Sequence, residues 1–285
     1  MAQTDLTKSL KRRFDKLKTN RQNWETHWQE VADYMLPRKA DVTKTRSKGD
    51  KRTELIFDSS PLQSVDLLAA SLHGMLTNPS TPWFTLRYKD PEIENDDEAK
   101  LWLESATDAM YVAFNRSNFQ QEIFELYHDL ITFGTACMFV QDDDEDTLKF
   151  STRHINEIYI AENEKGKVDT VYRLFKMSVR AASQQFGEAI STSTKGLITK
   201  DPYEEISILH AVYPRNDFDP KKQDRKNMPF ESVYMEYKNL NELSVAGFKE
   251  FPFVVPRYLK ASHEIYGRSP AMTALPDVKM LNEMS

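Results

Sequence analysis

Residues 120–141, QQEIFELYHDLITFGTACMFVQ, contain the change of pattern that decides the fold class. Up to Phe133 the apolar residues recur at helical spacing, so we predict a helix from Gln120 to Phe133 that is closed by Gly134. Beyond Gly134 the apolar period falls from 3.6 towards 2, which is typical of strands. Helices before this point and short strands after it indicate an α+β fold.

Three further helices are predicted before residue 120. The first, residues 6–35, carries an apolar stripe on one face and ends before Pro37. The second, residues 59–76, opens with a capping serine and a proline and should be largely buried. The third covers residues 96–114. Between the last two, residues 83–88 alternate as a strand does, and we expect their aromatic side chains to anchor the second helix.

A meander of short strands is predicted after Gly134, followed by a mixture of strands and helices. The strands are expected at residues 135–141, 148–152, 157–161, 168–175, 205–213, 231–238 and 245–258. A turn that contains Gly166 joins the third and fourth of them. Residues 178–186 form a helix between Ser178 and Gly187, residues 190–200 form a connector, and a last helix begins near residue 271. That helix is still in register at Ser285, so we expect the chain to be cut off there.

Composition excludes several classes of protein. Of 285 residues, 40% are hydrophobic and 11% aromatic, which is enough to bury a core and is not the composition of a disordered chain. The single cysteine, Cys137, excludes an intramolecular disulfide framework and a cysteine-based zinc cluster. No apolar run is long enough to span a bilayer, and the first residues lack the apolar core of a signal peptide, so we expect no membrane partner.

The charge is distributed unevenly. Residues 1–52 contain 14 Lys and Arg against 7 Asp and Glu, so this segment carries +7 while the remainder of the −6 chain carries −13. The basic residues before residue 53 either contact DNA phosphates or an acidic protein surface, or they form the solvated face of a helix and a basic exposed loop at residues 38–53. Possible partner or DNA contacts are Arg12, Arg13, Arg46, Lys48, Arg215, Lys221 and Lys222.

No motif predicts a catalytic, cofactor or metal site. The acidic run Asp142–Asp146 lacks the glycine and the final glutamate of a calcium-binding EF-hand, so it is expected to be a solvated turn. Ser269 lies in a sequence close to the nucleophile elbow of serine hydrolases, but Pro270 follows it and has no N–H for an oxyanion hole. The six histidines are scattered singly, and no phosphate-binding glycine loop occurs.

The order of the predicted elements resembles that of the portal, or head-to-tail connector, proteins of short-tailed bacteriophages. The resemblance spans nearly the whole chain and rests on the long amphipathic first helix, the segment LTNPSTPWFTL at residues 76–86, and the hairpin ENEKGKVD at residues 162–169. The residues that carry its structural motifs are Pro82, Trp83, Phe84, Gly134, Gly166, Tyr266, Gly267, Arg268, Ser269 and Pro270.

The resemblance implies a structural subunit and not an enzyme. Family members form a ring, usually of twelve subunits, at one capsid vertex, and DNA enters and leaves through its channel. The implied partners are further copies of the chain, the capsid protein, a terminase motor, a tail adaptor and double-stranded DNA, in the virion and, during assembly, in the host cytoplasm. The implied regions are the wing at 1–176, the approach to the stem helix at 177–199, a β-rich clip at 200–264, and the start of a second stem helix at 265–285, with the rest of the stem and the crown absent.

Two other functions stay open at this point. A phage-encoded metal-dependent nuclease or hydrolase would use the run Asp142–Asp146 or His154 to hold its metal. A nucleic-acid-binding accessory protein would use the basic N-terminal segment.

Overall fold

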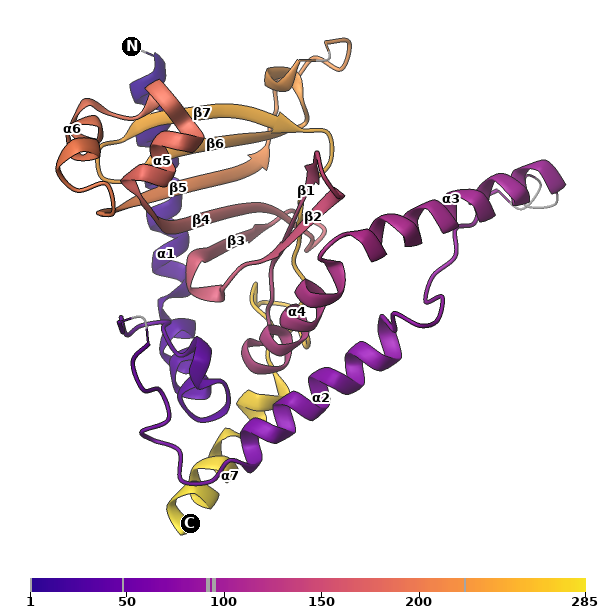
Figure 1. The fold of residues 1–285 in the computed structure, drawn as a ribbon, viewed down its shortest axis with the longest axis vertical. Helices are drawn as coiled ribbons and strands as arrows, with labels where there is room; N and C mark the ends of the chain where they lie inside the picture. The colour runs from indigo at the N-terminus through magenta and orange to yellow at the C-terminus, as the bar shows by residue number, and fades with distance from the viewer. Residues whose placement is uncertain (1, 48, 91–92, 94–95, 223) are drawn as a thin grey trace. The chain divides into compact units, whose positions relative to one another are not determined.

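The computed structural model describes residues 2–47, 49–90, 93, 96–222 and 224–285, which divide into two compact units. Unit 1 comprises the chain up to residue 27 together with residues 154–253 and 261–265. Unit 2 comprises residues 28–153, 254–260 and 266–285. Each unit contains helices and an antiparallel sheet (Figure 1), so the predicted α+β class is confirmed.

A five-stranded antiparallel sheet forms the centre of unit 1. Its strand order is β3-β4-β5-β6-β7. The strands are β3 (Ile158–Glu162), β4 (Val168–Ser178), β5 (Glu205–Pro214), β6 (Phe230–Glu236) and β7 (Asn241–Phe248). The predicted hairpin between β3 and β4 is present: Gly166 has a φ of +70°, and the Asn163 side chain accepts hydrogen bonds from the N–H groups of Lys165 and Lys167.

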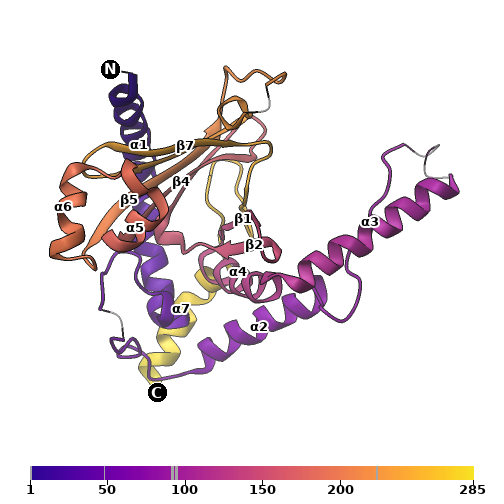
Figure 2. The ribbon, with the colours of Figure 1, turned by 45° about the horizontal axis from the view of Figure 1, so that its top comes forward.

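Both faces of this sheet are covered by helices (Figure 2). Leu10 and Phe14 of α1 (Ala2–Met35) pack on one face, around Leu209. Ile208, the preceding residue of β5, points to the other face, where it packs with Ala182 of α5 (Val179–Phe186). Neighbouring residues of one strand therefore belong to two different apolar layers, as the two-residue repeat of a strand requires.

The predicted connector at residues 190–200 is wrong in its second part, because α6 occupies Thr192–Lys200. The Ser191 hydroxyl caps this helix by accepting the Thr194 N–H at 3.3 Å. Short 3₁₀ turns in the described residues include η1 (Pro37–Lys39), η3 (Ile155–Glu157), η4 (Gly187–Ala189) and η5 (Arg225–Asn227).

The interior of unit 2 is built around α4 (Phe119–Phe133). Nine of its fifteen residues are buried, among them Leu126 and Ile131, because it is in contact with helices and with a strand. Its neighbours are α2 (Ser60–Leu76), α3 (Asp97–Arg116), α7 (Pro270–Met284) and β2 (Thr147–Thr152). The sheet of this unit has the order β2-β1-β8, with β1 at Met138–Asp143 and β8 at Phe253–Val254.

Two local expectations in unit 2 are wrong. Residues 83–88 are extended but belong to no strand. The described residues of the segment 38–53 mostly form an exposed loop, as predicted, and the Gln29 side-chain oxygen accepts the N–H groups of Val42 and Thr43 within it. Helix α2 is not largely buried, since only Pro61, Val65 and Ala69 of its residues are. Within the described parts of the chain, none of the helices combines the length and the apolar character needed to cross a membrane.

Candidate assembly surfaces

Gly134 and Gly267 bring two distant segments of unit 2 into direct backbone contact. Gly134 ends α4 with a φ of +74°, and a Cβ atom placed on it would lie 2.3 Å from the carbonyl oxygen of Gly267. A Cβ placed on Gly267 would lie 2.3 Å from the carbonyl oxygen of Gly134. The Gly267 N–H donates to the Thr135 hydroxyl at 2.8 Å. Only glycine fits at both positions of this crossing.

The other predicted motif residues of this region surround the crossing. The Trp28 indole donates to the carbonyl of Phe133 at 3.0 Å, and its ring packs edge-on against Tyr266 at 5.0 Å. The Ser269 hydroxyl donates to the Thr132 carbonyl at 2.8 Å and accepts the N–H of Met272 at 3.0 Å.

Pro270 and Arg268 complete this junction. Pro270 occupies the first turn of α7, which Ser269 caps, and the Arg268 backbone forms a bridge with Leu259. Because Ser269 is only 1% exposed, it is a capping residue and not a nucleophile. The junction is structural.

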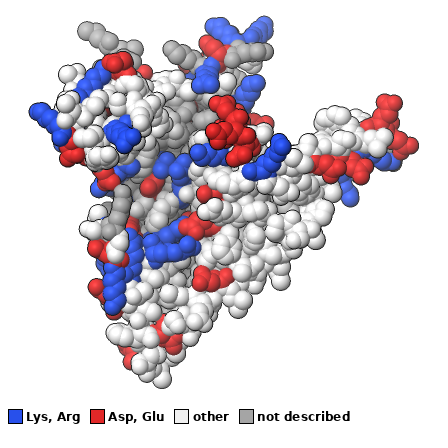
Figure 3. All heavy atoms as spheres, in the orientation of Figure 1, with Lys and Arg blue, Asp and Glu red and all other residues white. Residues whose placement is uncertain are grey.

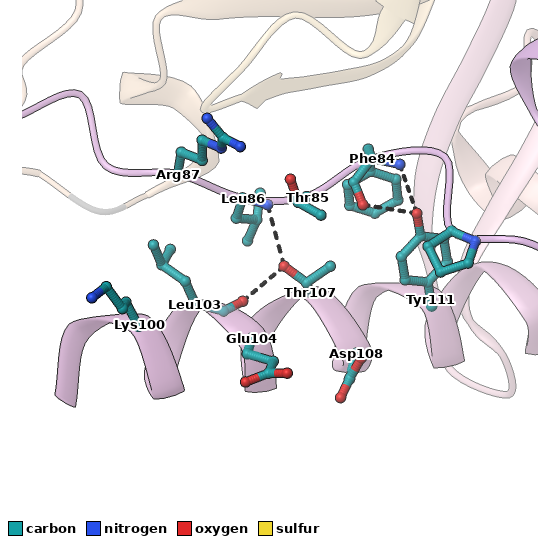
Figure 4. A pocket seen from close by; sticks show the side chains of 11 residues that line it. Phe84, Thr85, Leu86, Arg87, Lys100, Leu103, Glu104, Thr107, Asp108 and Tyr111 are labelled. Carbon is teal, nitrogen blue, oxygen red and sulfur yellow. Dashed lines mark hydrogen bonds between the residues drawn. The ribbon is translucent and has the colours of Figure 1, made fainter. Parts of the chain in front are cut away.

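Pro82, Trp83 and Phe84 lie along α3 and not along α2 as the sequence suggested. The Tyr111 hydroxyl accepts the N–H groups of Trp83 and Phe84 at 2.6 and 2.7 Å and donates to the Phe84 carbonyl at 2.9 Å. The Trp83 ring stacks on Phe119 at 5.9 Å. Figure 4 shows Phe84–Arg87 running alongside α3, with the Thr107 hydroxyl accepting the N–H of Leu86. The two segments line a hollow of about 380 Å³.

The charged residues selected from the sequence do not come together. Arg46 lies 3.5 Å from Asp33, and the side chain of Arg215 is 7% exposed and lies 3.2 Å from Glu231. Lys221 and Lys222 are exposed in the loop between β5 and β6, where Lys222 lies 4.0 Å from Asp219. Lys48 lies outside the described residues. Arg12 and Arg13 are exposed on α1.

A hollow of about 780 Å³ in unit 1 lies beside Arg12 and Arg13. Its walls come from α1, from β3 and β4, and from the end of β5. The rings of Tyr172 and Tyr213 stack at 6.5 Å on its floor, and the Arg13 guanidinium lies 5.5 Å from the Tyr213 ring centre. Burial raises the pKa of both tyrosines, so their hydroxyls stay protonated at neutral pH.

The acidic run Asp142–Asp146 forms the turn between β1 and β2, as predicted. The strands pair up to Asp143 and Thr147, and the Asp143 carboxylate accepts the N–H groups of Glu145 and Asp146. Asp142, Asp144, Glu145 and Asp146 are exposed. Figure 3 shows the run as a compact acidic patch.

Apolar side chains are exposed on α2 and α3. On α2, Leu67 is 71% exposed and Met75 81%; on α3, Leu101, Trp102 and Val112 are each more than half exposed. In Figure 3 the surface along α2 is largely uncharged, whereas α3 also carries charged side chains. A helix with apolar residues on all sides is normally buried, so α2 is expected to be covered by a partner.

An ion cluster that is buried at Asp129 and exposed at Arg38 connects η1 to α4. Lys39 Nζ lies 2.5 Å from Asp129 Oδ1 and 2.7 Å from Glu125, and Arg38 lies 3.0 Å from Glu125. Burial raises the pKa of Asp129 to about 6, because Lys39 only partly offsets the loss of water. Its second oxygen, Oδ2, has no hydrogen-bond partner among the described residues.

No described group of three or more His, Cys, Asp or Glu side chains could hold a metal ion. The His154 ring, which the hydrolase alternative would use, instead accepts the Asn156 N–H at 3.1 Å and caps η3.

Sequence reasoning did not predict that Arg21 is buried, because it was counted with the basic residues on the solvated face of the first helix. Arg21 is 1% exposed; it donates to the carbonyls of Ile155, Asn156 and Ile158 and lies over the Tyr159 ring at 3.7 Å. Its i+4 spacing to Glu25 was the available signal, since the two form an ion pair at 2.6 Å.

Comparison with known proteins identifies the same family as the resemblance in element order. The family model described as bacteriophage head to tail connecting protein matches residues 7–285. The chain belongs to this family. The "Probable portal protein" of Bordetella phage BPP-1 is 34% identical to it over 286 residues, which cover 99% of this chain and 52% of that protein. The "Portal protein" of Salmonella phage epsilon15 is 35% identical over 287 residues, which cover 99% and 51%.

The chain therefore spans about half the length of the curated relatives that it matches. Head-to-tail connecting proteins are structural components of the phage particle at the junction of head and tail, which is the class of protein that the sequence resemblance implied.

Proposed function

We propose that this chain acts as a structural subunit of a portal ring at one capsid vertex, through which the phage genome is packaged and ejected. The similarity to two portal proteins along 99% of the chain is the observation that carries this proposal. The two relatives are named as portal proteins, and the proposal extends that role to this member of the connector family.

The exposed apolar side chains of α2 and α3 support assembly into a ring. Leu67 and Met75 would each contribute about 1.5–3 kcal/mol if a neighbouring subunit buried them fully. An isolated subunit would instead leave this surface in water, which favours association.

Charge supports a channel through which DNA slides. Residues 53–285 carry a formal charge of −13, and a surface of this sign repels phosphates instead of binding them. The ring would also contact the capsid protein, a terminase motor and a tail adaptor. We keep the assignment of residues 1–176 to the wing, 177–199 to the approach to the stem and 200–264 to the clip, with a second stem helix from 265.

Electron microscopy and native mass spectrometry of the purified chain test the proposal. We expect closed rings with a central channel, with about twelve copies per ring, the number that the family resemblance implies. A chain that remains monomeric at micromolar concentration contradicts it.

The proposal also assigns no catalysis to the chain. We expect the purified protein to hydrolyse neither ATP nor DNA in the presence of Mg²⁺, because energy for packaging would come from the separate motor. Hydrolysis above background that disappears in the Asp144→Ala or His154→Ala variant would favour the hydrolase alternative.

A further inference from the structure

The hollow beside α1 in unit 1 carries an excess of positive charge. Arg12, Arg13 and Lys16 line it, against a single carboxylate, Asp169. The Arg13 guanidinium lies 5.5 Å from the Tyr213 ring centre, whereas Arg12 and Lys16 form no ion pair with another described residue. The stacked rings of Tyr172 and Tyr213 add an uncharged part to the lining of the hollow.

The turn between β1 and β2 carries the opposite charge at the end of a hairpin. Five consecutive carboxylates, at residues 142–146, occupy the end of a hairpin whose strands are paired up to the turn. Within the described chain, none of the five forms an ion pair, and the Asp143 carboxylate fixes the turn through two backbone N–H groups. The hollow that would receive the turn has a volume of about 780 Å³.

We propose that the acidic turn at residues 142–146 of one copy of the chain docks into the hollow lined by Arg12, Arg13 and Lys16 of a second copy. The proposal rests on the proposed function, because it describes a contact between neighbouring subunits. Since the two surfaces differ, the contact is heterologous, the type that generates rings when the rotation between copies closes.

Net charge favours a second copy over DNA as the occupant. The whole chain carries −6, so two copies repel one another unless complementary patches meet, and this pair of patches supplies that attraction. A DNA duplex meets the same overall repulsion and brings no feature shaped to the hollow.

Charge reversal tests the contact. The variant of the hollow, called the groove variant, is Arg12→Glu/Lys16→Glu. The variant of the acidic turn, called the turn variant, is Asp144→Lys/Glu145→Lys. The four side chains changed are exposed and hold no secondary structure together. At 50 mM salt, each variant should lose about tenfold or more of its assembled species relative to the parent chain. A control, Lys18→Glu/Lys200→Glu, reverses two exposed lysines of unit 1 outside the hollow and should assemble as the parent does.

Mixing distinguishes a contact between copies from one within a chain. An equal mixture of the groove variant and the turn variant should assemble with the two chains in equal numbers, since each groove then meets a turn of opposite charge. A chain that carries all four substitutions should also assemble. If the four-substitution chain assembles but the mixture does not, the contact lies within one chain and the proposal is overturned.

A cross-linking experiment detects the contact between two copies even when the copies do not assemble into rings. The native Cys137 is buried, so Lys16→Cys and Asp144→Cys chains, mixed under mild oxidation, should form a covalent dimer that neither forms alone. Cross-linking without rings supports the contact and contradicts the portal proposal; rings of the groove variant with no cross-link overturn the contact alone. If the groove variant assembles normally but loses salt-sensitive retention of a DNA duplex, the hollow binds DNA and the contact is also overturned.

Discussion

At the scale of single residues, the crossing of Gly134 and Gly267 explains why glycine occurs at both positions of unit 2. We expect Gly134→Ala to lower the free energy of unfolding by about 3 kcal/mol or more, since it combines a positive φ with a clash against backbone atoms. Thermal unfolding followed by circular dichroism measures the effect.

A matched control is Gly74→Ala in α2, where a Cβ atom would meet nothing within 4 Å. This change should raise stability by about 0.5–1 kcal/mol, as alanine in a helix does. If Gly134→Ala and Gly74→Ala change the stability equally, the backbones at Gly134 and Gly267 do not approach as closely as described.

The contribution of Arg21 to stability depends on the shape of its guanidinium group as well as on its charge. In Arg21→Lys a single ammonium would replace a planar group that donates to three carbonyls, so we expect a loss of about 2–4 kcal/mol in the free energy of unfolding. Urea unfolding gives the value. Arg180→Lys, at an exposed position of α5, should change stability by less than about 0.5 kcal/mol; if both variants behave alike, the buried hydrogen bonds contribute nothing.

At the scale of elements, the ion cluster between η1 and α4 makes the stability of the fold depend on the protonation of Asp129. The pKa of Asp129 in the folded protein, about 6, is above its unfolded value of 3.8, so folding favours the protonated form. The resulting stabilisation is present below pH 4 and is lost as pH rises from about 4 to 6. At about 1.36 kcal/mol per pKa unit the loss is on the order of 3 kcal/mol.

Comparing the parent with Asp129→Asn at several pH values checks this expectation. The difference in unfolding free energy between the two proteins should change by about 2–3 kcal/mol between pH 4 and pH 7, in the direction that favours the parent at low pH. Glu125 pairs with the same Lys39, and its charge helps to raise the pKa of Asp129, so the difference reports Asp129 together with its coupling to Glu125. A difference that stays constant with pH would contradict the raised pKa.

The edge strand β7 belongs to the region 200–264 that we assign to the clip. The outward N–H and C=O groups of an edge strand are available for pairing with another chain. Hydrogen exchange should show new protection at residues 241–248 in rings relative to isolated subunits. The central strand β5 is the internal reference, because its neighbours β4 and β6 already pair with it. Equal protection of β7 in both forms would mean that this edge pairs with no neighbour.

Local sequence signals predicted the helices and strands that carry their own boundary residues. Ser178 caps α5, Ser269 caps α7 and Gly134 closes α4, each where the pattern indicates it. Helix α6 was missed because its residues are small and polar and its only clear signal is the Ser191 cap. The alternation at residues 83–88 suggested a strand, but the Tyr111 hydroxyl takes two of the N–H groups that a sheet would need.

At the scale of the whole molecule, the apolar surface on α2 and α3 is the feature that sequence periodicity described least well. The periodicity correctly predicted helices α2 and α3. It could not distinguish apolar residues that are buried within the chain from apolar residues that are buried against a partner, since both produce the same pattern. The same limit applied to the charged candidates: whether Arg12 faces a hollow or Arg215 pairs with Glu231 depends on contacts between distant segments.

Replacing Leu67 and Met75 tests the role of that surface. Leu67→Ser/Met75→Ser should leave the melting temperature of an isolated subunit nearly unchanged, because both side chains are exposed, and should weaken assembly by about 3 kcal/mol or more per interface. Analytical ultracentrifugation over a range of concentrations measures both species. Ile198→Ser, in α6 of unit 1, removes an apolar side chain that is 38% exposed and lies elsewhere, and it should not affect assembly. If the double variant assembles as the parent does, the surface on α2 meets solvent in the ring.

The junction around Gly134 also affects the order in which the protein can fold during synthesis. The Thr132 carbonyl receives its hydrogen bond from Ser269, 137 residues later in the chain. At about 5–20 residues per second, a ribosome needs about 7–27 s to make that stretch. All five strands of unit 1 are synthesised within the interval. On a translating ribosome the sheet of unit 1 can therefore be complete while α4 still waits for its last partner, and its apolar face is then a substrate for chaperones.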